Sequence, residues 1–130
     1  MLTFDPNDLY SCRMATQEKE RLTILQGTLD LLILRILILG PQHGQGIARA
    51  IQSQSDDVLL VDHGSLYPAL QRLESRGWIA AEWGASDNNR KARFYTLTKQ
   101  GRKYLDRQTS QWRRMSKAIG RILGPDPVEG

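Results

Sequence analysis

Cysteine and histidine are scarce in this sequence of 130 residues, which contains Cys12, His43 and His63 and no others. A single cysteine cannot form a disulfide within the chain, and such usage is typical of a reducing compartment. A dedicated transition-metal site needs more ligands than these residues supply. We therefore expect no disulfide framework, no metal site and no cofactor.

A long hydrophobic segment is also missing. The apolar run Leu31–Leu39 is interrupted by Arg35. It is shorter than the roughly 20 residues that cross a bilayer. No secretory signal precedes it. These features predict a cytoplasmic, soluble protein that does not enter a membrane.

Catalytic patterns are absent as well. The sequence shows no nucleophile paired with a base, no paired carboxylates, no glycine-rich phosphate loop and no metal-ligand spacing. An enzyme is therefore disfavoured, and binding functions become the main candidates.

Positive charge is present but unevenly distributed. The formal net charge is +4. The segment 99–123 holds eight Lys or Arg residues and one acidic residue, Asp106, so it carries +7 and the rest of the chain −3. This charge permits binding to nucleic acid, but only local basic patches can indicate it.

The pattern along the chain divides it into four regions. Residues 1–21 contain the turn formers Asp5–Asp8 and a charged run, which predict an N-terminal extension that is flexible or a short helix. Met14 is an alternative start for the protein. The other regions are a main domain over 22–98, a long helix over 99–123 and a tail over 124–130.

Two helices and a short strand are predicted at the start of the main domain. Residues 28–39 are apolar on nearly every side and stop at Gly40, which predicts a central helix buried all round. A shorter helix, Ile47–Gln52, follows, and Val58–Val61 has the length of a strand. We interpret His43, between the two helices, as a capping or packing residue.

The next predicted helix, 63–76, is amphipathic. Asp62 is a suitable N-cap and Gly77 a suitable end. Pro68 forfeits one backbone hydrogen bond, which costs least near the first turn. The helix has an apolar stripe formed by Leu66, Leu70 and Leu73. Its opposite face is polar and carries His63, Gly64, Ser65, Tyr67, Gln71, Arg72 and Ser75.

A β-hairpin is predicted after this helix. Its strands are Trp78–Trp83 and Arg93–Leu97, and the turn formers Gly84–Asn89 lie between them. We expect Trp78 and Trp83 to pack in the core or against the strands rather than to form a ligand cage.

The last predicted helix, 99–123, is capped by Thr98 and would be about 37 Å long. It carries a seam whose positions alternate at spacings of three and four, as in a coiled coil. A domain of this size cannot bury such a stripe alone, so we predict that the helix pairs with a second copy of the chain. The seam residues are Leu105, Gln108, Trp112, Met115, Ile119 and Ile122.

This order of elements predicts a mainly α fold with a small β-hairpin, a winged helix-turn-helix followed by a long C-terminal dimerisation helix. In that fold the third helix enters the major groove and the hairpin touches phosphate or the minor groove. Gln reads adenine, Arg reads guanine, and Ser or Tyr binds phosphate. We therefore predict contacts to double-stranded DNA from His63, Gly64, Ser65, Tyr67, Gln71, Arg72, Asn89, Arg90, Lys91 and Arg93. The alternative for each polar face is an ordinary solvated surface.

Four segments, Gly27–Leu34, Gly40–Gly44, Gly64–Gly77 and Arg93–Gly101, together resemble the PadR family of bacterial transcription regulators. The block Gly-Ser-Leu-Tyr-Pro-Ala-Leu and the later Tyr-x-Leu-Thr-x-x-Gly are its most specific parts. The residues Glu-Trp-Gly before Asn-Asn-Arg resemble the subgroup with a single C-terminal dimerisation helix. Gln45 departs from the family, which often has Tyr after His-Gly.

The resemblance implies a homodimeric winged-helix repressor on a palindromic operator, with Tyr67 at the DNA backbone. The seam suggests a further partner, a small apolar or aromatic effector in a pocket lined by Trp112 and Met115. The alternative is that Trp112 only fills the seam. For the whole chain, the alternative function is a winged-helix protein–protein interaction module without specific DNA binding.

Overall fold

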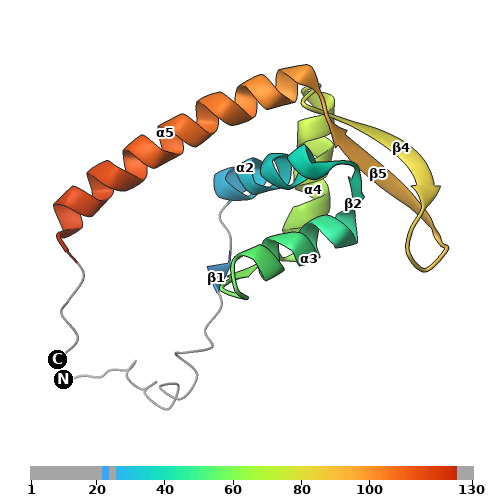
Figure 1. The fold of residues 1–130 in the computed structure, drawn as a ribbon, viewed down its shortest axis with the longest axis horizontal. Helices are drawn as coiled ribbons and strands as arrows, with labels where there is room; N and C mark the ends of the chain where they lie inside the picture. Colours follow the sequence, from blue (N-terminus) through green and yellow to red (C-terminus); the bar gives the residue numbers. More distant parts are fainter. Residues whose placement is uncertain (1–21, 24–25, 126–130) are drawn as a thin grey trace, which may run out of the picture.

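The protein was analysed as a computed structural model that describes residues 22–23 and 26–125. The predicted N-terminal extension with Met14, and the end of the tail, lie outside these residues. Three helices, three short strands, a two-stranded hairpin and a long final helix follow one another (Figure 1). Their bounds are β1 Leu22–Thr23, α2 Gln26–Ile36, the 3₁₀ turn η2 Leu37–Leu39, β2 Gln42–His43, α3 Gly44–Gln54, β3 Leu59–Leu60, α4 His63–Ser75, β4 Ile79–Ala85, β5 Lys91–Leu97 and α5 Lys99–Leu123.

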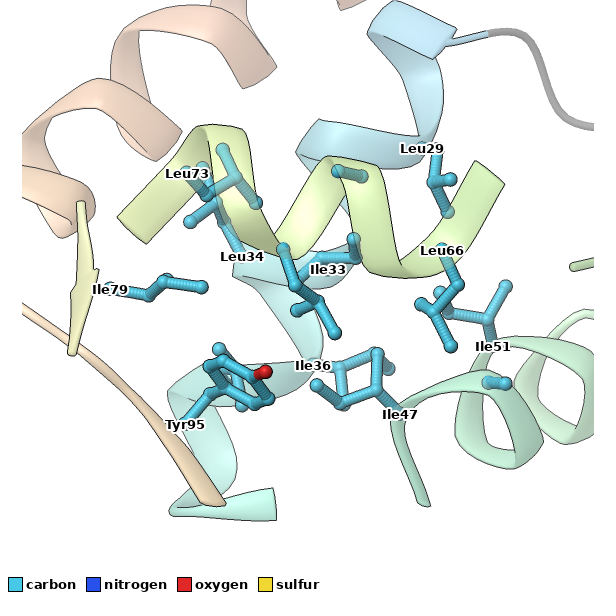
Figure 2. Close-up of a cluster of buried hydrophobic side chains, with 14 of the residues drawn as sticks. Leu29, Ile33, Leu34, Ile36, Ile47, Ile51, Leu66, Leu73, Ile79 and Tyr95 are labelled. Carbon is cyan, nitrogen blue, oxygen red and sulfur yellow. The ribbon is translucent and has the colours of Figure 1, made fainter. Parts of the chain in front are cut away.

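Helices α2, α3 and α4 surround one hydrophobic core, with β4, β5 and the first turns of α5 packed beside them (Figure 2). We call this unit, residues 26–105, the head. The core contains the apolar stripe predicted for α4. Its fully buried side chains are Leu29, Ile33, Leu34, Ile47, Leu66, Leu70, Leu73, Ile79 and Leu105.

The expectation that 28–39 is one helix buried on every side is wrong at its end. Helix α2 stops at Ile36, and Leu39 in the following 3₁₀ turn is 81% exposed. Gly40 has a φ of +138°, which an L side chain rarely adopts, and it turns the chain away from the helix. The segment therefore contains more apolar side chains than the head buries.

Helix α3 starts three residues earlier than predicted, at Gly44. His43 caps it, because its Nδ1 accepts a hydrogen bond from the Gly46 N–H at 3.1 Å. The same ring lies edge-on to Phe94, with centroids 5.3 Å apart. The interpretation of His43 as a capping or packing residue is confirmed.

The hairpin is longer and its turn tighter than predicted. Strands β4 and β5 pair in antiparallel register from Ile79 opposite Leu97 to Ala85 opposite Lys91. Residues 86–90 therefore connect the two strands. The Ser86 N–H donates a hydrogen bond to the Arg90 carbonyl at 2.8 Å and closes the turn. The strand β2 adds to the free edge of β5, and β1 pairs with β3 in parallel.

Helix α5 has the predicted bounds and leaves the head at a tightly built junction. The Thr98 hydroxyl accepts a hydrogen bond from the Gly101 N–H at 3.0 Å and donates one to the Gly77 carbonyl at 2.7 Å. A Cβ at Gly101 would lie 2.0 Å from the carbonyl oxygen of Trp78. Only glycine lets α5 pass so close to the hairpin.

From the hairpin junction, α5 runs past α2, and its C-terminal end projects beyond the other helices on the side opposite the hairpin (Figure 1). Within the described residues, no helix is long and apolar enough to cross a membrane.

Candidate nucleic-acid interface

Helix α4 begins with the predicted cap. The Asp62 carboxylate accepts hydrogen bonds from the Gly64 N–H at 3.3 Å and the Ser65 hydroxyl at 3.4 Å. These bonds satisfy donors that would otherwise be free in the first turn. The cap therefore fixes where the helix starts and which residues face outward.

The outermost stripe of α4 is formed by residues that are all exposed and recur at helical spacing. They are Gly64, Pro68, Gln71 and Ser75. Pro68 is the sixth helical residue, one turn beyond the position where its cost would be least. It leaves the Gly64 carbonyl without its helical donor, and this is tolerated because both residues are exposed. The stripe thus offers the Gln71 amide and a backbone acceptor outward.

Tyr67 lies on one flank of this stripe and is 46% exposed. Its ring packs on the first residue of α3, since a Cβ at Gly44 would lie 2.9 Å from both Cε1 and the hydroxyl oxygen. The hydroxyl therefore sits beside the N-terminus of α3, where the helix dipole favours anions and the Gly46 N–H is already bonded to His43.

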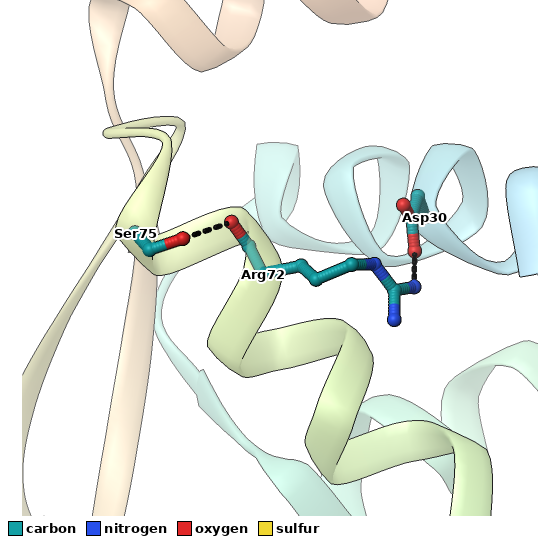
Figure 3. Close-up of polar contacts among 3 residues, drawn as sticks. All are labelled: Asp30, Arg72 and Ser75. Carbon is teal, nitrogen blue, oxygen red and sulfur yellow. Dashed lines mark hydrogen bonds and ion pairs between the residues drawn. The ribbon is translucent and has the colours of Figure 1, made fainter.

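Arg72 lies on the other flank, and its predicted place on the outward face is wrong. Its guanidinium donates a hydrogen bond to Asp30 of α2 at 2.7 Å, and the two side chains are 31% and 20% exposed (Figure 3). Its backbone carbonyl accepts a hydrogen bond from the Ser75 hydroxyl at 3.0 Å. Arg72 thus ties α4 to α2 instead of presenting a free guanidinium.

The hairpin is joined to α4 by an ion pair. The Arg93 guanidinium contacts Glu74 at 2.9 Å, so Arg93 is partly neutralised. Asn89, Arg90 and Lys91 are exposed near the turn, and Asn89 has a φ of +62°. The structure therefore brings Arg93 to the side of α4 and leaves Asn89, Arg90 and Lys91 exposed near the hairpin turn.

The environment of Tyr95 shows that these groups share one region. Burial raises the pKa of the Tyr95 hydroxyl above its ordinary value, Arg93 opposes this shift, and Glu74 and Tyr67 add to it. The Arg93–Glu74 ion pair is the contact that joins the flank of α4 to this face of the hairpin.

Helix α5 exposes most of its predicted seam. Trp112, Met115, Ile119 and Ile122 are between 44% and 85% exposed, and Gln108 is half-buried. The prediction that Leu105 belongs to the seam is wrong. Leu105 is 2% exposed and packs in the core of the head. The exposed apolar stripe therefore starts after Leu105.

A cavity of about 510 Å³ lies between the start of α2 and the middle of α5. Trp112 and Met115, the predicted effector residues, both line it. Tyr104, which sequence reasoning missed, also lines the cavity and stacks on Trp78 with ring centroids 3.6 Å apart.

The comparisons with known proteins agree with this architecture. The family model described as "Transcriptional regulator PadR-like family" matches residues 33–107, more than half of the chain. This chain belongs to the PadR-like family of transcriptional regulators. It is similar to an uncharacterised protein of Lysinibacillus sphaericus, at 28% identity over 76% of this chain and 91% of the relative.

Solved structures agree with the assignment of this PadR-like regulator. A transcriptional regulator from Clostridium thermocellum is 28% identical with a TM-score of 0.70, covering 76% of this chain and 96% of that one. A PadR family transcription regulator from Clostridium difficile is 30% identical with a TM-score of 0.62, covering 74% and 98%. The predicted family, winged-helix fold and class of DNA-binding regulator are confirmed.

The roles of Asp30 and Gly44 near the candidate interface were missed in the sequence, and the expectation for Trp83 was partly wrong. Asp30 is 42 residues from Arg72, and no local pattern connects them. Gly44 was noted only as part of a motif, although its missing side chain makes room for Tyr67. Trp83, expected in the core or against the strands, is not in the core, because it is 62% exposed and lies beside Lys91 of β5.

Proposed function

We propose that this PadR-like regulator is a repressor that binds a palindromic operator as a homodimer. The observation that carries the proposal is the shared surface of α4 and the hairpin, joined by the Arg93–Glu74 pair at 2.9 Å. It presents polar and cationic groups that suit a duplex. A module that binds only other proteins would not require these polar and cationic groups on α4 and the hairpin.

Within this surface, each group has a distinct role. Gln71, at the centre of the exposed stripe, has the amide that pairs bidentately with adenine. The Tyr67 hydroxyl and the start of α3 bind one phosphate, assisted by His63 on the same flank. Arg90, Lys91 and Asn89 bind phosphates from the hairpin. Arg72 and Ser65 orient α4, because their side chains are engaged within the protein.

Dimerisation completes the site. Two α5 helices that bury their stripes against each other place two α4 helices about one DNA turn, roughly 34 Å, apart. A small apolar or aromatic effector in the cavity beside Trp112 and Met115 would change the angle between α2 and α5. Such a change alters the spacing of the two heads and therefore the affinity for DNA.

The proposal is tested by binding to the DNA upstream of the protein's own gene. We expect Gln71→Ala to weaken specific binding about 10- to 100-fold, the value of a good bidentate contact. Gln100→Ala, which removes an exposed glutamine at the start of α5, is the matched control and should bind as the wild type. Lys91→Ala and Arg90→Ala should each lower the salt slope by about one.

Two results would overturn the proposal. Gln71→Ala could bind as tightly as the wild type, which would remove α4 from base recognition. The wild type could fail to bind this DNA at both about 50 mM and about 200 mM salt, which would favour the interaction module.

A further inference from the structure

One large aromatic side chain on the hairpin has no role in the proposed interface so far. Trp83 of β4 is 62% exposed, and the Lys91 ammonium lies 5.2 Å from the centre of its ring. A cation over an indole ring is favourable. The hairpin thus displays an exposed apolar plane with a positive charge on it.

Trp83 points to the same side as the groups that face α4. It lies directly opposite Arg93, and Ala85 lies opposite Lys91, so all four side chains share one face of the hairpin. Towards the head this face is covered, because Tyr95 on it is 6% exposed. Beyond Arg93, which binds Glu74 of α4, the face continues into solvent with Trp83 and Lys91.

This exposed end of the hairpin lies at the opposite end of the molecule from the distal part of α5 (Figure 1). A second copy that covers the stripe from Trp112 to Ile122 would therefore leave Trp83 open. Arg93 is paired with Glu74, but Arg90 and Lys91 outnumber Asp87 near the turn, and this small excess of positive charge favours an anionic occupant.

We infer that Trp83 packs on a deoxyribose at the edge of the groove beside the one that α4 enters, while Lys91 binds the adjacent phosphate. The inference rests on the proposed function and adds an apolar contact to it. Sugars and phosphates alternate along a strand, so an apolar ring with a cation beside it matches their chemistry. Bases in an intact duplex are stacked inside and offer no face to the ring. The contact is therefore independent of sequence and fixes how the hairpin sits on the backbone.

The test measures binding of variants to the DNA upstream of the protein's own gene at about 50 mM and about 200 mM salt. Trp83→Ala should weaken binding roughly tenfold with an unchanged salt slope, because it removes an apolar contact. Trp83→Phe should recover part of the loss. Lys91→Ala should lower the slope by about one. Val58→Ala removes another exposed apolar side chain, away from the hairpin, and should bind as the wild type.

The outcomes separate this inference from the function on which it rests. If the wild type binds this DNA and Trp83→Ala binds equally well, the inference is wrong and the proposed function stands. If Trp83→Ala instead produces monomers in sedimentation, Trp83 belongs to a protein interface and the inference is also wrong. Failure of the wild type to bind DNA contradicts the proposed function itself. Thermal unfolding of Trp83→Ala, compared with Trp83→Phe and the wild type, identifies any loss of binding that comes from misfolding.

Discussion

The head and the distal part of α5, residues 106–123, use their apolar residues in opposite ways. In the head, side chains such as Ile33 and Leu70 are at most 1% exposed. In distal α5, Met115 and Ile122 are 55% and 85% exposed. The head completes its core alone, whereas the distal helix has an apolar stripe that only another surface can cover. The apolar residues of the head thus stabilise the protomer, whereas those of distal α5 are available for the proposed dimer.

The largest expected effect comes from charging the uncovered stripe. Trp112→Asp combined with Ile119→Asp should give monomers in sedimentation and reduce affinity for DNA about a hundredfold or more, because the two heads then bind independently. Ser110→Asp, on the opposite side of the same helix, adds one charge and should leave the dimer intact. If the double variant remained a stable dimer, the prediction that the seam forms the dimer interface would be wrong.

The junction between the two regions should be nearly as sensitive. Gly101→Ala would place a Cβ 2.0 Å from the Trp78 carbonyl oxygen, and relief requires α5 to shift. We expect a loss of about 2–3 kcal/mol in the free energy of unfolding. Gly120→Ala, on the same helix with nothing within 4 Å, should instead stabilise slightly. Equal melting temperatures for the two variants would show that the junction is not tight.

A smaller effect is expected where the head meets DNA. Gly44→Ala would push the Tyr67 ring away from the start of α3, since the added Cβ would lie 2.9 Å from the hydroxyl oxygen. The exposed ring can move, so stability should change little while DNA affinity falls severalfold. Tyr67→Ala in the Gly44→Ala background should add little further loss. Additive losses in this double-mutant cycle would mean that the two residues act separately.

The smallest effect concerns pH. Burial raises the pKa of Tyr95 in the folded state, while the unfolded chain titrates near its ordinary value of about 10. This contribution to stability is complete below pH about 10 and is lost as the pH rises through the raised pKa. Urea unfolding of Tyr95→Phe should therefore lose less stability than the wild type between pH about 8 and about 11. Parallel losses would exclude a role for this hydroxyl.

The sequence predicts those elements whose caps and periodicity are local. Helix α5 has a Thr cap and helix α4 an Asp cap, and both begin where predicted. The first turn of α3 was missed because it is glycine-rich and capped by His43, which is not among the usual capping residues.

The candidate site was harder to predict, because tertiary contacts decide which polar residues stay free. Arg72 has the spacing of an outward residue, but Asp30 holds it on the flank. Leu105 continues the heptad spacing of the seam although it belongs to the core of the head. The three- and four-residue spacing of the seam continues unchanged from the head into distal α5. Spacing alone therefore cannot show which residue is the first to contact a second copy of the chain.

In the proposed dimer, two heads held by paired α5 helices read two half-sites. The decisive measurement is a footprint of the wild type and of the Trp112→Asp, Ile119→Asp variant on the DNA upstream of the protein's own gene. We expect two protected half-sites, related by symmetry and about 10 base pairs apart centre to centre, for the wild type only. A single protected half-site for the wild type, or the same two-site footprint for the variant, would contradict it.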